Sequence, residues 1–114
     1  MTRRLKDKGR AGEDLVAAHY QSLGYTILHR NYSFSDGELD IVAIKGDCLT
    51  FVEVKVVDHI TDIDGYVTPK KIGFLSRAIE WYLTKYPSNH EISLDVAFVH
   101  GNTIIEVYEN VTNS

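Results

Sequence analysis

Two short apolar segments joined by a tight turn constrain the fold more than any other feature of this chain. Residues 39–44 and 49–57 are rich in β-branched side chains, and Gly46-Asp47 between them is typical of a two-residue hairpin turn. Both predicted strands carry apolar side chains at even and odd positions, so both faces of the hairpin are apolar. A sheet of this kind is covered on both faces. The hairpin therefore predicts a layered α/β fold.

The remaining patterns supply two helices and three further strands. A helix is predicted over about residues 8–23, ending at Gly24, and a second helix begins at Thr68-Pro69, a capping residue followed by a first-turn proline. The further strands are predicted at residues 25–32, 92–99 and 103–108. The predicted order is α-β-β-β-α-β-β, a mixed sheet flanked by helices, in a single domain that spans residues 1–114.

Composition excludes several classes of protein. With 44% hydrophobic and 25% charged residues, the chain is neither disordered nor collagen-like. Its longest apolar runs have four residues, as at residues 41–44, far short of the ~20 residues of a membrane helix, and the first residues lack the apolar segment of a secretory signal. The single cysteine, Cys48, fits a reducing compartment, so we expect a cytoplasmic protein without membrane contact. Five scattered histidines show no zinc-binding spacing.

The charge is unevenly distributed along the chain. The formal net charge is −4, which argues against a general electrostatic binder of nucleic acid, yet residues 1–10 carry +4 and the remainder −8. Residues 1–7 are therefore interpreted as a basic arm, which either solubilises the chain or contacts phosphates. Lysines at the start of the second helix oppose the helix dipole, so they are either a solvated pair or a seat for a phosphate. The candidate phosphate-binding residues are Arg3, Arg4, Lys6, Lys8, Arg10, Lys70 and Lys71.

The hairpin register brings acidic residues together. A two-residue turn pairs the residues that flank it, and the same register places Asp40 opposite Glu53 and Glu38 opposite Lys55. All four side chains then project from one face, with opposed Cβ atoms about 5 Å apart. Facing carboxylates repel each other, so a positive charge must balance them.

Two interpretations of this cluster remain open at this point. One is a structural ion-pair network balanced by Lys55. The other is a divalent cation held by Asp40 and Glu53, with the backbone carbonyl of Val54 as a third oxygen ligand and Lys55 beside it.

The spacing of these residues resembles a known signature. Asp40 followed by Glu53-Val54-Lys55 on the next strand resembles the PD-(D/E)xK nuclease motif. A longer series of motifs resembles the YraN-like family of uncharacterised bacterial proteins, which are predicted endonucleases distantly similar to archaeal Holliday junction resolvases. The series, which covers about residues 9–100, is Gly12-Glu13, Gly24-Tyr25, Arg30-Asn31-Tyr32, Gly37-Glu38-Leu39-Asp40, Phe51-Val52-Glu53-Val54-Lys55 and Thr68-Pro69-Lys70-Lys71.

The resemblance implies a restriction-endonuclease-like fold and a catalytic site. Asp40 and Glu53 would be ligands of Mg²⁺ or Mn²⁺, Lys55 the catalytic lysine and Glu13 an outer acid. The implied activity is cleavage of nucleic acid, with DNA, including branched or nicked duplexes, favoured over RNA, which stays open. A homodimer is one option for the oligomeric state. One departure is Val57, where the family usually has an arginine.

Two further interpretations are kept beside the nuclease. They are a nucleic-acid-binding module without useful turnover and a protein-interaction domain with a structural acidic cluster. Asp95, which interrupts an apolar strand, is interpreted as a structural acid, although the family often has an acid there.

Overall fold

The computed structural model describes residues 2–35 and 37–113, and the side chains of residues 9–35 and 37–112. Its elements follow the predicted order α-β-β-β-α-β-β, with two short 3₁₀ helices added. They are α1 (Thr2–Ser22), β1 (Thr26–Phe34), β2 (Gly37–Lys45), β3 (Cys48–Val56), η1 (Ile60–Ile63), α2 (Pro69–Lys85), β4 (Glu91–His100), β5 (Thr103–Tyr108) and η2 (Val111–Asn113). The α/β fold predicted from the sequence is confirmed.

The first helix begins earlier than predicted. Its backbone is helical from Thr2 rather than from about residue 8, so the segment interpreted as a separate arm continues α1. The periodicity argument missed these turns because they are dominated by charged residues and lack an apolar stripe. The other helix ends agree with the sequence. Thr68 accepts a hydrogen bond of 3.1 Å on its hydroxyl from the Lys71 N–H, and Gly24 after α1 has a φ of 97°.

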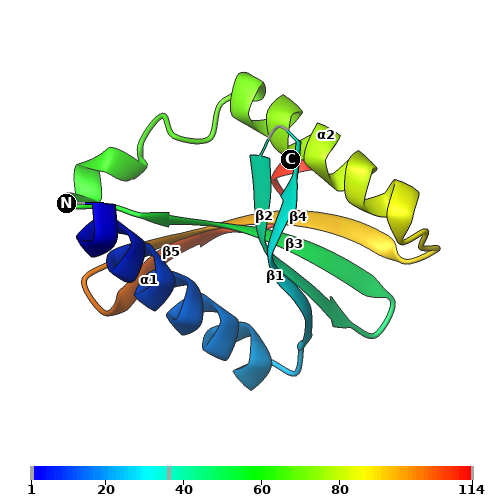
Figure 1. The fold of residues 1–114 in the computed structure, drawn as a ribbon, viewed down its shortest axis with the longest axis horizontal. Helices are drawn as coiled ribbons and strands as arrows, with labels where there is room; N and C mark the ends of the chain where they lie inside the picture. The colour runs from blue at the N-terminus through cyan, green and yellow to red at the C-terminus, as the bar shows by residue number, and fades with distance from the viewer. Residues whose placement is uncertain (1, 36, 114) are drawn as a thin grey trace.

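The five strands form one sheet in the order β1-β2-β3-β4-β5. All neighbours are antiparallel except β3 and β4, which are parallel and are connected through η1 and α2. Figure 1 shows α1 on one side of this sheet and α2 on the other, in an arrangement consistent with the restriction-endonuclease-like fold. Among the described residues, no helix has the length and apolar character needed to span a membrane.

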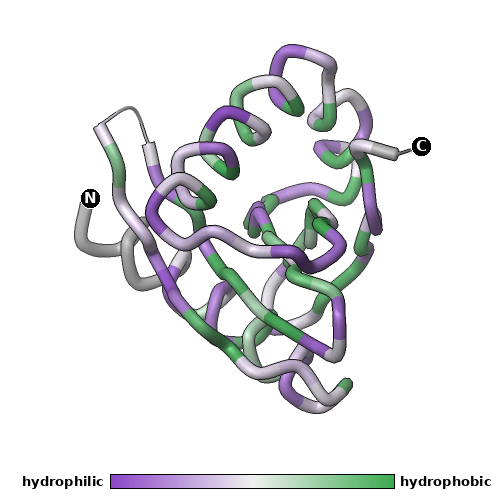
Figure 2. Tube along the Cα trace, turned by 90° about the vertical axis from the view of Figure 1, so that its right-hand side faces the viewer, coloured by the Kyte–Doolittle hydropathy of each residue, from purple (hydrophilic) through white to green (hydrophobic). Residues whose placement is uncertain are grey.

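Each helix covers its own hydrophobic core. Apolar strand residues lie between the helices and account for the hydrophobic segments at the centre of Figure 2. The core under α1 contains Val16, Ala17, Tyr20, Ile41, Ala43, Val52, Ala97 and Val99. The core under α2 includes Val42, Leu49, Phe51, Leu75, Ala78, Ile79, Tyr82, Leu94 and Phe98.

Gly12 fixes how closely α1 approaches the sheet. A Cβ atom at this position would lie 2.7 Å from Val56 Cγ2 and 3.8 Å from Val99 Cβ. Only a residue without a side chain therefore fits between α1 and the strands β3 and β4 at this separation. The close approach also sets the position of Glu13, the next residue on α1.

The paired strands β2 and β3 separate part of the way along their length. Their register follows the prediction from Lys45–Cys48 to Ile41–Val52, where the ladder ends. Beyond this point β2 continues to pair with β1, and β3 continues to pair with β4. In Figure 1 the β1–β2 hairpin turns away from β3 towards α2. We call this separation the fork and define it by residues 38–40 of β2 and 53–55 of β3.

The fork corrects one part of the predicted register. Asp40 was predicted to lie opposite Glu53 and Glu38 opposite Lys55, but among the described residues no β2–β3 ladder pair exists beyond Ile41–Val52. The divergence coincides with irregularities in β1, which has a bulge between Ile27 and His29 and a left-handed residue at Asn31, with a φ of 51°. Such irregularities bend and twist a strand, and a two-residue turn gives no indication of them.

Candidate active site

At the start of the fork, the Asp40 side chain replaces the backbone partner that the Val54 N–H would have in a continuous ladder. Its Oδ2 atom accepts a hydrogen bond of 2.8 Å from the Val54 N–H. In the interrupted ladder that N–H would have met the carbonyl of Leu39. Because the N–H and C=O of a residue in an antiparallel ladder point to the same neighbour, the Val54 carbonyl also points into the fork.

Asp40 and Glu53 are neighbours at the fork, close enough for Glu53 to act on the pKa of Asp40. Burial raises the pKa of Asp40, and repulsion by Glu53 raises it further, whereas the Val54 N–H lowers it. The pair therefore favours a bound proton or a cation between the two groups.

The far side of Glu53 is covered by groups from the connection between β3 and α2. Its Oε2 atom accepts a hydrogen bond of 3.0 Å from the Tyr66 hydroxyl and lies 2.9 Å from Lys71 Nζ. Two ammonium groups lie near the Tyr66 ring, with Lys71 Nζ at 5.2 Å and Lys55 Nζ at 5.3 Å from its centroid. The Glu53 carboxylate is therefore bordered by an acid on one side and by cations on the other.

These contacts shift the protonation of Tyr66 and Lys71. Burial raises the pKa of the Tyr66 phenol, and the nearby Glu53 carboxylate raises it further. Burial alone would lower the pKa of the Lys71 ammonium, but the hydrogen bond and attraction to Glu53 outweigh it and raise the pKa. Both groups are thus held in their protonated forms beside Glu53.

An outer group of acids lies where α1 meets the β1–β2 hairpin. Glu13, Glu38 and Asp40 each offer a carboxylate oxygen, and these oxygens lie within 4.8 Å of one another. Asn31 connects two of them, because its Nδ2 atom donates at 2.6 Å to Glu13 and at 3.2 Å to Glu38. Burial raises the pKa of Glu13, and repulsion by Glu38 adds to this shift. Two elements, α1 and β2, therefore contribute carboxylates to this outer group.

This outer group borders an open cavity of about 400 Å³. The cavity is lined by Gly9, Arg10, Glu13, Asn31 and Glu38. Arg30 lies at its margin, 2.7 Å from Asp14 and 4.0 Å from Glu13. Solvent therefore reaches Glu13 and Glu38, and the cationic side chain of Arg10 lies beside them in the cavity lining.

The structure also places the other residues singled out in the sequence. Lys70 is exposed, and the side chains of Arg3, Arg4, Lys6 and Lys8 lie outside the described ones. Val57 is only 3% exposed and packs in the core under α2, so the position where the resemblance implies an arginine is buried.

Asp95 lies away from the fork, on the α1 side of the sheet. It accepts hydrogen bonds from the Tyr20 hydroxyl at 2.6 Å, the Ser93 hydroxyl at 3.0 Å and the Asn110 N–H at 3.0 Å. Its interpretation as a structural acid is confirmed.

Two residues of the site were missed in the sequence. Asn31 belongs to the quoted motif Arg30-Asn31-Tyr32, which could have indicated a role. Tyr66 lies in a connecting segment between η1 and α2 without any periodic pattern, so nothing in the sequence indicated it.

The fold and the site together define an α/β protein of the restriction-endonuclease-like type, with acids from α1, β2 and β3 gathered at a fork in the sheet. Residues 12–99 match the model of the Uncharacterised protein family UPF0102, and the chain belongs to this family. The matched range contains every residue of the fork. The resemblance to the YraN-like family is confirmed.

Relatives across distant bacteria match nearly the whole chain. The UPF0102 protein of Neisseria meningitidis serogroup C is 35% identical over 108 residues, covering 92% of this chain and 94% of the relative. The UPF0102 protein of Helicobacter hepaticus is 35% identical over 107 residues, covering 94% and 96%. That of Flavobacterium johnsoniae is 33% identical over 112 residues, covering 93% and 91%.

Proposed function

We propose that this protein is a metal-dependent endonuclease that hydrolyses phosphodiester bonds in DNA. The observation that carries the proposal is the meeting of Asp40 and Glu53 at the point where their strands separate. A sheet gains nothing from two adjacent carboxylates, since like charges across strands are destabilising. Their placement is explained when a cation belongs between them.

The donor atoms at the fork fit a hard divalent cation. Asp40, Glu53 and the Val54 carbonyl would hold Mg²⁺ or Mn²⁺, because all three offer oxygen. The raised pKa of Asp40 supports this fit, since it reflects the burial of the carboxylate together with repulsion from Glu53. When bound, such an ion lowers the pKa of water and stabilises negative charge on a phosphate. Glu13 would act from the outer group, orienting water around the inner acids.

The remaining residues would position and stabilise the substrate. The Val54 N–H holds one Asp40 oxygen, so the direction of that carboxylate is fixed before substrate arrives. Lys55 projects from the same strand as Glu53 and reaches the Tyr66 ring. Its ammonium would offset charge that develops on the phosphate oxygens in the transition state.

DNA would be held by a local basic rim, because the chain as a whole carries a net charge of −4. The rim would consist of Arg3, Arg4, Lys6, Lys8, Arg10, Lys70 and Lys71. Contacts to phosphates position a duplex without reading its sequence, so we expect sequence-tolerant binding in the cytoplasm.

A second candidate function is DNA binding without turnover. Val57 favours it, because this buried valine offers no charge to a phosphate where the resemblance implies an arginine. A panel of branched, nicked and linear DNAs separates the two functions. Binding of Mn²⁺ and DNA without cleavage of any substrate would support the second.

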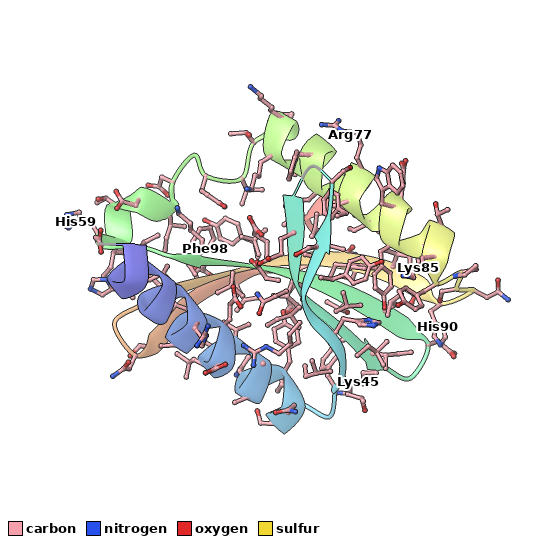
Figure 3. The ribbon with its side chains drawn as sticks, viewed as in Figure 1. Lys45, His59, Arg77, Lys85, His90 and Phe98 are labelled. Atoms are coloured by element: carbon pink, nitrogen blue, oxygen red, sulfur yellow. The ribbon has the colours of Figure 1, made fainter. Side chains whose placement is uncertain are left out.

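The decisive comparison is wild type against Lys55→Ala with Mg²⁺ or Mn²⁺. We expect cleavage to fall by about 10²–10³, because one electrostatic contact in the transition state is lost. Metal affinity measured by calorimetry should stay unchanged, since an ammonium has no lone pair for a cation. Lys85→Ala is the matched control, because Lys85 lies at the far end of α2 (Figure 3). Full activity of Lys55→Ala, or equal losses in both variants, would contradict the assignment.

A further inference from the structure

Lys71 differs from its neighbour Lys70 in what it touches. Both lie in the first turn of α2, where the helix dipole disfavours cations. Lys70 is exposed, whereas Lys71 folds back to Glu53 with 2.9 Å between Nζ and Oε2. The Tyr66 and Phe74 rings lie 5.2 Å and 5.9 Å from the same ammonium. Lys71 is therefore held at Glu53 rather than spread into solvent.

This contact occupies one oxygen of the carboxylate that would hold the metal. Glu53 Oε2 receives both Lys71 and the Tyr66 hydroxyl, which use the two lone pairs of that oxygen. Glu53 is only 11% exposed, so the attraction to Lys71 is weakly screened. A divalent cation that enters the fork would meet the ammonium as a like charge, and the two compete for the same carboxylate.

We propose that Lys71 is the counter-cation of Glu53 in the metal-free site. When the metal binds, Lys71 leaves Glu53 and binds a DNA phosphate. The proposal rests on the metal-dependent DNA cleavage proposed above and adds how the site is loaded. With no metal, Lys71 balances Glu53 and keeps the two carboxylates together. With metal, it is released from Glu53.

The position of Lys71 determines where the released ammonium goes. Lys71 Nζ lies 5.2 Å and Lys55 Nζ 5.3 Å from the centroid of the Tyr66 ring, so a DNA phosphate bound near this ring would be close to the released ammonium. A DNA phosphate that takes Lys71 removes the competitor from Glu53, and a metal that takes Glu53 frees Lys71 for DNA. Each ligand therefore strengthens the other by the same factor, as linkage requires.

The first measurement is Mn²⁺ affinity by calorimetry in the absence of DNA. We compare wild type, Lys71→Gln and Lys70→Gln, since the two variants have the same net charge and differ in the contact with Glu53. We expect Lys71→Gln to bind Mn²⁺ about 5- to 10-fold more tightly, at the lower end of usual coupling between sites. Lys70→Gln should change much less. Lys71→Met repeats the test, and thermal melts establish that each variant is folded.

The second measurement is DNA affinity with and without Mn²⁺, by fluorescence anisotropy in a Lys55→Ala background, in which cleavage should be too slow to affect the measurement. Mn²⁺ should tighten DNA binding in this background and in its Lys70→Gln version, but not in its Lys71→Gln version. The proposal is overturned if Lys71→Gln binds Mn²⁺ no more tightly than Lys70→Gln, or if it keeps the full gain in DNA affinity. Absence of Mn²⁺ binding in wild type, with and without DNA, would instead overturn the proposed function itself and this inference with it.

Discussion

Asp40 accepts a hydrogen bond of 2.8 Å from the backbone N–H of Val54, across the gap where β2 and β3 cease to pair. This contact joins the fold to the site. One oxygen of Asp40 completes the backbone hydrogen bonding of β3, and the same carboxyl group meets Glu53. A substitution at Asp40 therefore acts on stability and on metal binding through different atoms.

Asp40→Asn should stabilise the metal-free protein at alkaline pH. The amide oxygen can still accept from Val54, and the amide nitrogen can donate to Glu53, so repulsion is replaced by attraction. The folded-state pKa of Asp40 is raised, so the folded protein holds a proton that the unfolded chain releases, and wild-type stability falls as pH rises. The gain in melting temperature in a chelating buffer should thus be small at about pH 4.5 and reach a few degrees above about pH 8. The same variant should lose Mn²⁺ binding. A gain independent of pH would contradict the electrostatic origin.

Gly12→Ala should destabilise the protein by about 1–3 kcal/mol, the usual cost of overpacking a tight contact. The added Cβ would lie 2.7 Å from Val56 Cγ2, so α1 must move away from β3. Gly9→Ala is the control, because a Cβ at Gly9 meets nothing within 4 Å, and alanine favours helix over glycine by about 1 kcal/mol. In urea unfolding, Gly12→Ala should lower the free energy of unfolding and Gly9→Ala should raise it. Equal effects would mean that α1 is loosely packed.

Tyr20→Phe should cost about 1–3 kcal/mol, because the Asp95 carboxylate, which is 4% exposed, loses a hydrogen bond of 2.6 Å. Tyr25→Phe serves as the comparison, since its ring packs edge-on against Tyr20 with 5.1 Å between centroids. Removing that second hydroxyl should have a much smaller effect in thermal or urea unfolding. If Tyr20→Phe leaves the free energy of unfolding unchanged, solvent replaces the lost donor at Asp95.

Deleting residues 2–6 should make DNA binding less sensitive to salt. The deletion removes Arg3, Arg4 and Lys6, and each duplex phosphate contact contributes about 0.9 to the slope of log affinity against log salt. The slope should flatten by up to about 2.7 if all three bind phosphate. Replacing the three residues with glutamine keeps α1 at full length and should give the same result. An unchanged slope, measured with Ca²⁺ in place of Mg²⁺, would make this segment a solubilising extension.

The sequence was sufficient for the features that depend on neighbouring residues. The turn at Gly46-Asp47 determined the register as far as Ile41–Val52, and the Thr68 cap determined the start of α2. Alternation then placed Asp40 and Glu53 on one face, which was enough to bring their carboxyl groups together.

Features that depend on distant packing could not be predicted. The end of the β2–β3 ladder accompanies the bend of β1 around Asn31 and the contact of α2 with the hairpin tip, where a Cβ on Gly37 would lie 2.9 Å from Phe74 Cζ. Tyr66 reaches Glu53 only because the crossover connection passes over the fork. Neither arrangement leaves a periodic pattern in the sequence.

The fork also bears on how this chain avoids self-association. Where β2 and β3 part, each presents a free strand edge, and such edges readily recruit strands from other molecules. Here the Val54 N–H is already occupied by Asp40, and any added strand would have to bury Glu38 and Glu53 beside a third acid. The carboxylates make the site suitable for a cation. They also disfavour the pairing of this open sheet edge with strands of other molecules. Variants that neutralise several of them should be screened for fibril formation as well as for activity.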